Sequence, residues 1–194
     1  MYYDMADTGK IIIVSAPSGT GKSTIISRII DDPKLALGFS VSCTSRAPRT
    51  GETEGKDYYF VSPEEFARRV GDDRFIEWEE VYPGTCYGTL ASEVERVTGQ
   101  GRNLILDIDV KGALNVKERY GDRAMSVFIM PPSLEVLGRR LRSRATDSED
   151  AIRTRLAKAG QEMEFAPRFD KIVVNDSLEK AVDALRDTIA DFVS

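Results

Sequence analysis

The stretch that decides the fold is Ser15-Ala16-Pro17-Ser18-Gly19-Thr20-Gly21-Lys22-Ser23-Thr24, which directly follows the apolar run Ile11-Ile12-Ile13-Val14. Beyond it, apolar residues repeat at helical spacing, at Ile25, Ile26, Ile29 and Ile30. A buried strand, a glycine-rich turn and a helix start are the setting of a phosphate-binding loop. The two glycines let successive N–H groups turn toward phosphate oxygens, and the positive end of the helix points the same way.

Two residues of this loop have expected roles in binding the phosphates and the metal ion. Lys22 would reach the outer phosphates, and Ser23 offers its hydroxyl to a magnesium ion. The general pattern G-x-x-x-x-G-K-[ST] has its first glycine where this chain has Ala16, so Ala16 must adopt a conformation that a small side chain tolerates. A plain flexible turn is the alternative, but it requires the strand, the Lys-Ser pair and the helix to coincide by chance.

The bulk composition narrows the function classes. The 194 residues suffice for one full core with small insertions, and 27 basic against 32 acidic residues argue against a dedicated nucleic-acid binder. Two cysteines, no signal-like N-terminus and no long apolar run predict a soluble cytoplasmic protein with no membrane partner. The chain has no histidine, the usual general base. Phosphoryl transfer can proceed without histidine, because the reaction mainly needs the reacting groups to be positioned and positive charge to be placed around them.

Further apolar stretches predict an α/β fold with a parallel sheet. We expect core strands at Asn103–Ile108, Ser126–Met130 and Lys171–Asn175, with helices alternating between them. Together with the first strand they would bring Gly19, Asp107 and Asn175 together at the carboxyl ends. A last helix from about Leu178 to Phe192 carries an apolar face that packs on the core.

Two segments depart from this core, which we assign to residues 1–39, 99–136 and 160–194. Residues 40–98 contain short aromatic and β-branched runs broken by Pro and Gly, which predict a small, partly antiparallel insertion. From Leu134 to Met163 the pattern is a helix, a polar break at Ala145–Ser148 and a second helix. We assign residues 137–159 of it to a helical lid.

The segment Ser40-Val41-Ser42-Cys43-Thr44-Ser45-Arg46-Ala47-Pro48-Arg49-Thr50-Gly51-Glu52 groups hydroxyls and two arginines around a proline. Planar guanidinium groups suit phosphate, so Arg46 and Arg49 are candidates to grip one phosphate from two sides. Taken alone, the segment fits an exposed polar loop equally well.

The whole pattern resembles the guanylate kinases, nucleoside-monophosphate kinases that phosphorylate GMP. The resemblance runs nearly end to end and rests on the loop, the 42–52 segment, Gly55-Lys56-Asp57-Tyr58, Phe75-Ile76-Glu77-Trp78, Tyr87-Gly88-Thr89, Ile105-Leu106-Asp107-Ile108-Asp109 and Arg140-Leu141-Arg142-Ser143-Arg144. Ala16 matches a form common among bacterial members. Thr89 stands where many members have serine, which keeps the hydroxyl.

This resemblance implies a P-loop parallel-sheet core with a mixed α+β GMP-binding insertion and a helical lid. It also implies direct in-line transfer from MgATP, bound by residues 16–24 and, at its adenine, by Asn175, to GMP or dGMP. The implied partners are ATP and GMP, with no nucleic acid and no membrane, and the motifs do not specify an oligomeric state.

For GMP, the resemblance assigns the phosphate to Arg46, Arg49, Tyr58 and Tyr87, and the guanine ring to Ser42, Glu77 and Thr89. The chemistry of the base agrees with Glu77. Guanine presents two adjacent donors, N1–H and the N2 amino group, that one carboxylate can accept, whereas adenine presents an acceptor at N1. Glu77 can therefore supply base choice by itself.

Asp107 ends an apolar strand, and a carboxylate there faces the magnesium ion held by Ser23 in P-loop proteins. The resemblance also places Asp107 near GMP, and we leave both contacts open. We rank Asp109 as a weaker candidate, on the expectation that Ile108 between them would send the two side chains to opposite faces if the strand continued.

The lid arginines are the remaining catalytic candidates. Arg140 and Arg144 lie four residues apart on one flank of the first lid helix. Arg155 is expected on the inward stripe of the second. In the family the lid closes over ATP, and its arginines, with Lys22, neutralise charge on the transferred phosphoryl group.

Two other interpretations are weighed against this one. A catalytically silent guanylate-kinase-like module of scaffold proteins typically lacks a working loop and lid arginines, whereas Lys22 and Arg140 are present here. A P-loop kinase for another phosphorylated acceptor, such as a ribose bisphosphate, would leave Glu77 and Thr89 without a base to bind.

Overall fold

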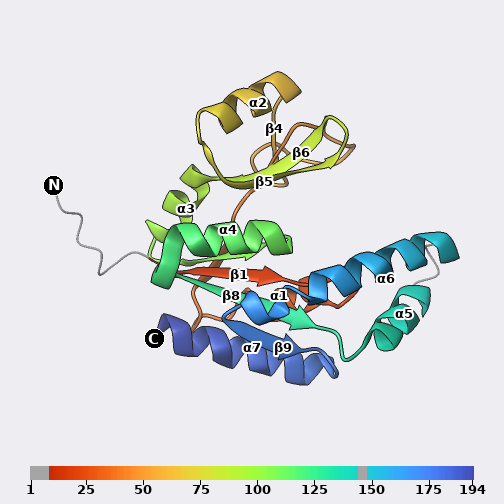
Figure 1. The fold of residues 1–194 in the computed structure, drawn as a ribbon. Helices are drawn as coiled ribbons and strands as arrows, with labels where there is room; N and C mark the ends of the chain where they lie inside the picture. The colour runs from red at the N-terminus through yellow and green to blue at the C-terminus, as the bar shows by residue number, and fades with distance from the viewer. Residues whose placement is uncertain (1–8, 144–147) are drawn as a thin grey trace.

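The computed structural model of the chain describes residues 9–143 and 148–194 (Figure 1). In this part the central sheet has five strands, all paired in parallel, in the order β2-β7-β1-β8-β9. They are β1 (Ile11–Ser15), β2 (Leu37–Phe39), β7 (Asn103–Asp107), β8 (Ala124–Met130) and β9 (Lys171–Val174). The parallel sheet is confirmed. The prediction missed β2, because three residues centred on Gly38 carry little strand signal.

Helices cover both faces of this sheet, as the alternation of strand side chains requires. Ile12 and Val14 pack with α1 (Lys22–Ile29) and α7 (Leu178–Val193). Ile11 and Ile13 pack on the other face with α3 (Ala91–Thr98) and α4 (Val110–Tyr120). The three-layer α/β core and the last helix are therefore confirmed. 3₁₀ helices cover Gly121–Arg123 and Ala166–Arg168.

The insertion lies above this core in Figure 1 and has its own mixed sheet, in the order β4-β3-β6-β5. Its elements are β3 (Cys43–Thr44), β4 (Tyr59–Phe60), α2 (Pro63–Gly71), β5 (Phe75–Tyr82) and β6 (Thr85–Leu90). β5 and β6 form an antiparallel hairpin, while β3 and β4 are parallel. Its buried cluster is small and centres on Cys43, Phe66 and Phe75.

The predicted lid is a pair of helices, α5 (Leu134–Ser143) and α6 (Glu149–Met163), at the side toward which β1 and β8 point (Figure 1). Ser148 caps α6, its hydroxyl accepting a hydrogen bond from the N–H of Ala151. The rest of the expected break lies outside the described residues. None of the described helices combines the length and apolar character needed to cross a membrane.

Candidate active site

The loop between β1 and α1 adopts the conformation that its glycines allow. Gly19 has φ +89° and Gly21 has φ +98°. Among the described residues other than glycine, only Ala36 and Asp73 have positive φ, so Ala16 adopts the ordinary conformation expected of it. Gly21 caps α1 without a side-chain hydrogen bond, which leaves the first N–H groups of the helix available to an anion.

Neighbouring elements pack tightly against this loop. A Cβ on Gly19 would lie 2.6 Å from Leu141 Cδ2, and one on Gly21 would lie 2.8 Å from Asn175 Nδ2. The Asn175 amide donates a 2.6 Å hydrogen bond to the carbonyl of Thr20. The loop is thus held by the lid helix α5 and by Asn175, the residue after β9, and a side chain at either glycine would force these neighbours to shift.

One side of the loop faces a cavity of about 500 Å³. It is lined by residues 16–19 and 21–24 of the loop and by Asp107, Ile108, Asp109 and Glu162. The ammonium group of Lys22 forms an ion pair with Asp107, and Ser23 is exposed. A hydroxyl and a carboxylate on one cavity wall are the hard oxygen ligands that Mg²⁺ prefers, so Ser23 and Asp107 fit a magnesium site.

Asp109 departs from the expectation. β7 ends at Asp107, and Asp109 caps α4, where its Oδ1 accepts hydrogen bonds from the N–H groups of Lys111 (2.7 Å) and Gly112 (3.1 Å). Both carboxylates line the same cavity. The prediction that they point to opposite faces was wrong, because side chains two residues apart in a strand share one face, and because β7 in any case ends at Asp107.

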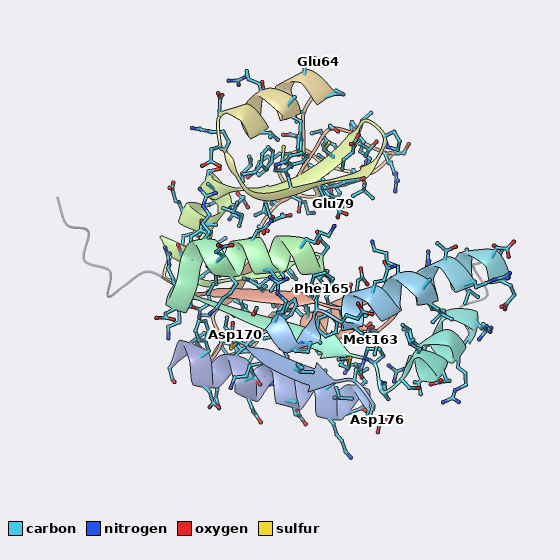
Figure 2. The ribbon with its side chains drawn as sticks, in the orientation of Figure 1. Glu64, Glu79, Met163, Phe165, Asp170 and Asp176 are labelled. Carbon is cyan, nitrogen blue, oxygen red and sulfur yellow. The ribbon has the colours of Figure 1, made fainter. Side chains whose placement is uncertain are left out.

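A second cavity, of about 240 Å³, lies between the insertion and the core. The expected acceptor residues Ser42, Tyr58, Glu77 and Tyr87 line it, together with Asp107. Figure 2 shows Glu79, another lining residue, on the side of β5 that faces the core. The fold therefore brings five distant segments of the sequence to one place.

Glu77 is the central carboxylate of this cavity. It lies directly across the hairpin from Thr89, whose hydroxyl donates a 2.6 Å hydrogen bond to Glu77 Oε1. Burial raises the pKa of Glu77, and the charge of Asp109 adds to this, while the hydrogen bond from Thr89 opposes it. The first turn of α4 lies close, since a Cβ on Gly112 would be 3.3 Å from Glu77 Oε2. Thr89 thus fixes the orientation of a carboxylate at the cavity wall.

Arg46 is held beside this cavity by a carboxylate that the sequence analysis did not single out. Two guanidinium nitrogens donate to Glu52 at 2.6 and 2.7 Å, and Nε donates to the Tyr87 hydroxyl at 3.0 Å. The guanidinium also lies 5.0 Å from the centre of the Tyr58 ring. The hydrogen bonds from Arg46, then that from the Arg49 N–H, lower the pKa of Glu52 to about 2. Arg49 itself is exposed.

On the opposite side of the loop, a cavity of about 320 Å³ is lined by Gly19, Thr20, Gly21, Thr24, Arg140, Ser143, Asn175 and Leu178. Gly19 thus shares one cavity with Asp107 and another with Asn175, as expected for the carboxyl ends of the strands. Arg140 Nη2 donates to the carbonyl of Asn175 at 2.9 Å and to that of Asp176, labelled in Figure 2, at 3.3 Å. Its Nη1 is buried without a hydrogen bond.

The other two lid arginines fall elsewhere. Arg144 lies outside the described residues. Arg155 is exposed on α6, and the inward stripe consists of Ile152, Leu156 and Ala159. Placing Arg155 on that stripe was wrong, because at 3.6 residues per turn Leu156 takes the inward position four residues after Ile152.

Comparison with known proteins matches nearly the whole chain to one family. Residues 8–192 match the family model described as guanylate kinase. The chain is 52% identical over 185 residues to a guanylate kinase of Porphyromonas gingivalis, covering 95% of this chain and 98% of that protein. It is 48% identical over 184 residues to one of Bacteroides fragilis, covering 95% and 90%. The crystal structure of guanylate kinase from Anaplasma phagocytophilum matches with TM-score 0.70 at 33% identity, covering 96% of this chain and 87% of that one.

Proposed function

Because the chain belongs to the guanylate kinase family, we propose that it transfers the γ-phosphoryl group of ATP to GMP or dGMP, directly and in line, without a covalent enzyme intermediate. One observation carries this proposal. The loop cavity and the insertion cavity both include Asp107, Ile108 and Asp109. A donor phosphate in the first cavity and an acceptor phosphate in the second would meet at the end of β7.

In the donor half, the free N–H groups of the loop bind the phosphates of ATP, and Lys22 exchanges Asp107 for phosphate oxygens. The loose transition state of phosphoryl transfer spreads negative charge over the moving group, so Lys22 and the lid arginines Arg140, Arg144 and Arg155 act as its counter-charges. Asn175 and the cavity behind the loop take the adenosine.

Ser23 and Asp107 would hold Mg²⁺, which when bound neutralises charge on the β- and γ-phosphates. The ion pair between Lys22 and Asp107 keeps both groups at the cavity wall before the nucleotide arrives. Exchange of this ion pair for contacts between Lys22 and phosphate would couple binding of the donor to release of the Asp107 carboxylate from Lys22.

In the acceptor half, Arg46, Arg49, Tyr58 and Tyr87 bind the GMP phosphate, and Ser42, Glu77 and Thr89 bind the base. The Thr89 hydroxyl holds one carboxylate oxygen of Glu77 so that the carboxylate can accept N1–H and the N2 amino group of guanine. Adenine would place an acceptor against this carboxylate, which explains the selection.

These assignments give each part of the chain one task. Residues 40–98 bind GMP, residues 137–159 close over ATP, and residues 1–39, 99–136 and 160–194 hold the phosphate loop. Both cysteines, Cys43 and Cys86, are free thiols, which suits a reducing cytoplasm.

An assay of ADP release over a panel of acceptors tests the function. We expect turnover with GMP and dGMP, weaker turnover with IMP, which lacks the N2 amino group, and none with AMP or a ribose bisphosphate. Lys22→Met is the control for contaminating kinases. A chain that binds GMP without releasing ADP is a binding module, and turnover of the sugar bisphosphate would assign a different acceptor; either result overturns the proposal.

A further inference from the structure

Glu93 is a buried carboxylate on α3 that belongs to none of the motifs. Its side chain is 2% exposed and accepts four hydrogen bonds. Oε2 accepts from the N–H of Val41 at 2.6 Å and from Arg96 Nη2 at 2.7 Å, and Oε1 accepts from the Tyr59 hydroxyl at 3.0 Å and from Arg96 Nε at 2.8 Å. Burial alone would raise the pKa of Glu93, but these hydrogen bonds, Arg96 foremost, hold it below its ordinary value. The ionised carboxylate is therefore fully partnered.

These hydrogen bonds join two parts of the molecule. Although α3 belongs by sequence to the 40–98 segment, its Val94 and Val97 pack in the same buried cluster as Leu104 of β7, so this helix is fixed to the core. Val41 and Tyr59 belong to the insertion. Arg96, which neutralises Glu93, also donates a 3.2 Å hydrogen bond to the carbonyl of Phe39, the last residue of β2. Glu93 thus anchors the insertion near the point where the chain leaves the central sheet.

Both insertion partners of Glu93 are direct neighbours of acceptor-site residues. Val41 precedes Ser42, and Tyr59 follows Tyr58. The N–H of Tyr59 donates a 2.9 Å hydrogen bond to the carbonyl of Ser42, which ties the two segments together. Tyr58 forms a bridge with Glu54 directly before β4, and successive side chains of an extended chain point to opposite faces, so Tyr59 held toward Glu93 directs Tyr58 to the other face. Ser42 and Tyr58 line the cavity that contains Glu77.

We propose that Glu93 is a positioning residue for the acceptor nucleotide. It touches no substrate, and it holds Val41 and Tyr59 so that Ser42 and Tyr58 stay in place at the cavity wall. The inference rests on the proposed function, because it takes GMP as the occupant of that cavity. The partners of Glu93 are residues 41, 59 and 96, none of which lines the loop cavity, so the donor side is independent of it.

Glu93→Gln is the test, because glutamine keeps the shape but removes the charge and turns one acceptor into a donor. We expect the KM for GMP to rise roughly 5- to 50-fold, as for loss of a buried charged hydrogen-bond partner. The KM for ATP and kcat at saturating GMP should stay within about twofold, a split that general destabilisation does not produce. Glu95→Gln, an exposed glutamate of the same helix, is the matched control and should change neither constant.

If Glu93→Gln does not fold, Tyr59→Phe is the second test. This variant is a milder change, because it removes only the single hydroxyl group that donates to Glu93. Its KM for GMP should rise a few-fold, by roughly 2- to 10-fold for one hydrogen bond. An unchanged KM for GMP in either folded variant overturns the inference, as does a parallel change of both KM values and kcat. A wild-type chain without GMP turnover overturns the proposed function too, whereas an active wild type with unaffected variants overturns this inference alone.

Discussion

The phosphate loop and the insertion offer different parts of the chain to their proposed ligands. The loop follows β1, all of whose residues are buried, and presents main-chain N–H groups at the start of α1. The insertion has a small buried cluster around Phe66 and presents side chains from separate segments, such as Glu77 and Tyr87. The first is a local structure fixed by the core, and the second depends on the tertiary fold of the insertion.

This difference separates the recognition of phosphate from the choice of the acceptor base. Main-chain N–H groups recognise phosphate in any nucleotide, so the loop supplies binding and charge without base choice. In the proposed function, side chains such as Glu77, which is oriented by Thr89, would read a pattern of donors, so the insertion would supply the choice of acceptor. Changes in the two regions should therefore have separable effects.

The largest effect is expected from Lys22→Met, which removes the charge aimed at the transferred phosphoryl group. The kcat should fall at least about 100-fold, the scale for loss of one preorganised charge contact. GMP affinity, measured by titration, should stay near that of the wild type, because Lys22 does not line the insertion cavity. A variant with near-normal kcat would remove Lys22 from the catalytic machinery.

Glu77→Gln should have the next largest effect, because it places a donor against a donor of guanine. We expect kcat/KM for GMP to fall about 10- to 100-fold, since a buried polar group is left unpaired. The KM for ATP should barely change. Glu80→Gln on the same strand is the control, because its side chain contacts the hairpin turn at Gly84. Wild-type efficiency of Glu77→Gln with GMP would place base recognition elsewhere.

The same contrast explains what the sequence could predict. The loop was predictable to the residue, because its glycines and the flanking apolar runs act locally. β2 and the orientation of Arg155 were not, since a three-residue strand and the phase of a helix depend on packing. Glu52 and Glu93 were missed because their partners, such as Arg46 and Tyr59, come together only in the fold. The sequence signal that could have pointed to them is a glutamate three residues from an arginine, as in Arg49 with Glu52 and Glu93 with Arg96.

A smaller effect is expected from pH. Burial raises the pKa of Glu77 above its ordinary 4.5, so the carboxylate that accepts guanine is lost as pH falls through this raised value. The effect of Glu77 on the stability of the fold has the opposite sign. The stabilisation that comes from its raised pKa is present below pH 4.5 and is lost as pH rises through the raised pKa. We expect the KM for GMP to rise, relative to that of Glu77→Gln, as the pH is lowered from about 7 toward the ordinary pKa of 4.5.

Glu77→Gln serves as the reference for the pH dependence. The phosphate of GMP also titrates, with a pKa near 6, and it does so with both proteins. The ratio of the two KM profiles therefore isolates residue 77. A constant ratio over this range would mean that Glu77 does not titrate in the binding equilibrium.

The smallest effect is a change of shape. The insertion and the lid lie on separate sides of the core (Figure 1), and phosphoryl transfer requires that water be excluded between them. Small-angle scattering should show a lower radius of gyration with a bisubstrate analogue than for the free protein. Equal radii would contradict closure of the two parts over the substrates.

Whether the donor and acceptor sites are built separately is tested most directly by a crossed titration in a calorimeter. A non-hydrolysable ATP analogue and GMP are titrated separately into the wild type, Gly21→Ala and Glu77→Gln. Gly21 has φ +98°, and its added Cβ would lie 2.8 Å from Asn175 Nδ2, so alanine there distorts the loop.

Gly21→Ala should raise the Kd of the ATP analogue at least about 10-fold and leave that of GMP within about twofold, because the strain acts on the loop alone. Glu77→Gln should give the reverse pattern. If either variant lowers the affinity for both ligands by the same factor, the donor and acceptor sites are not built from separate parts of the chain.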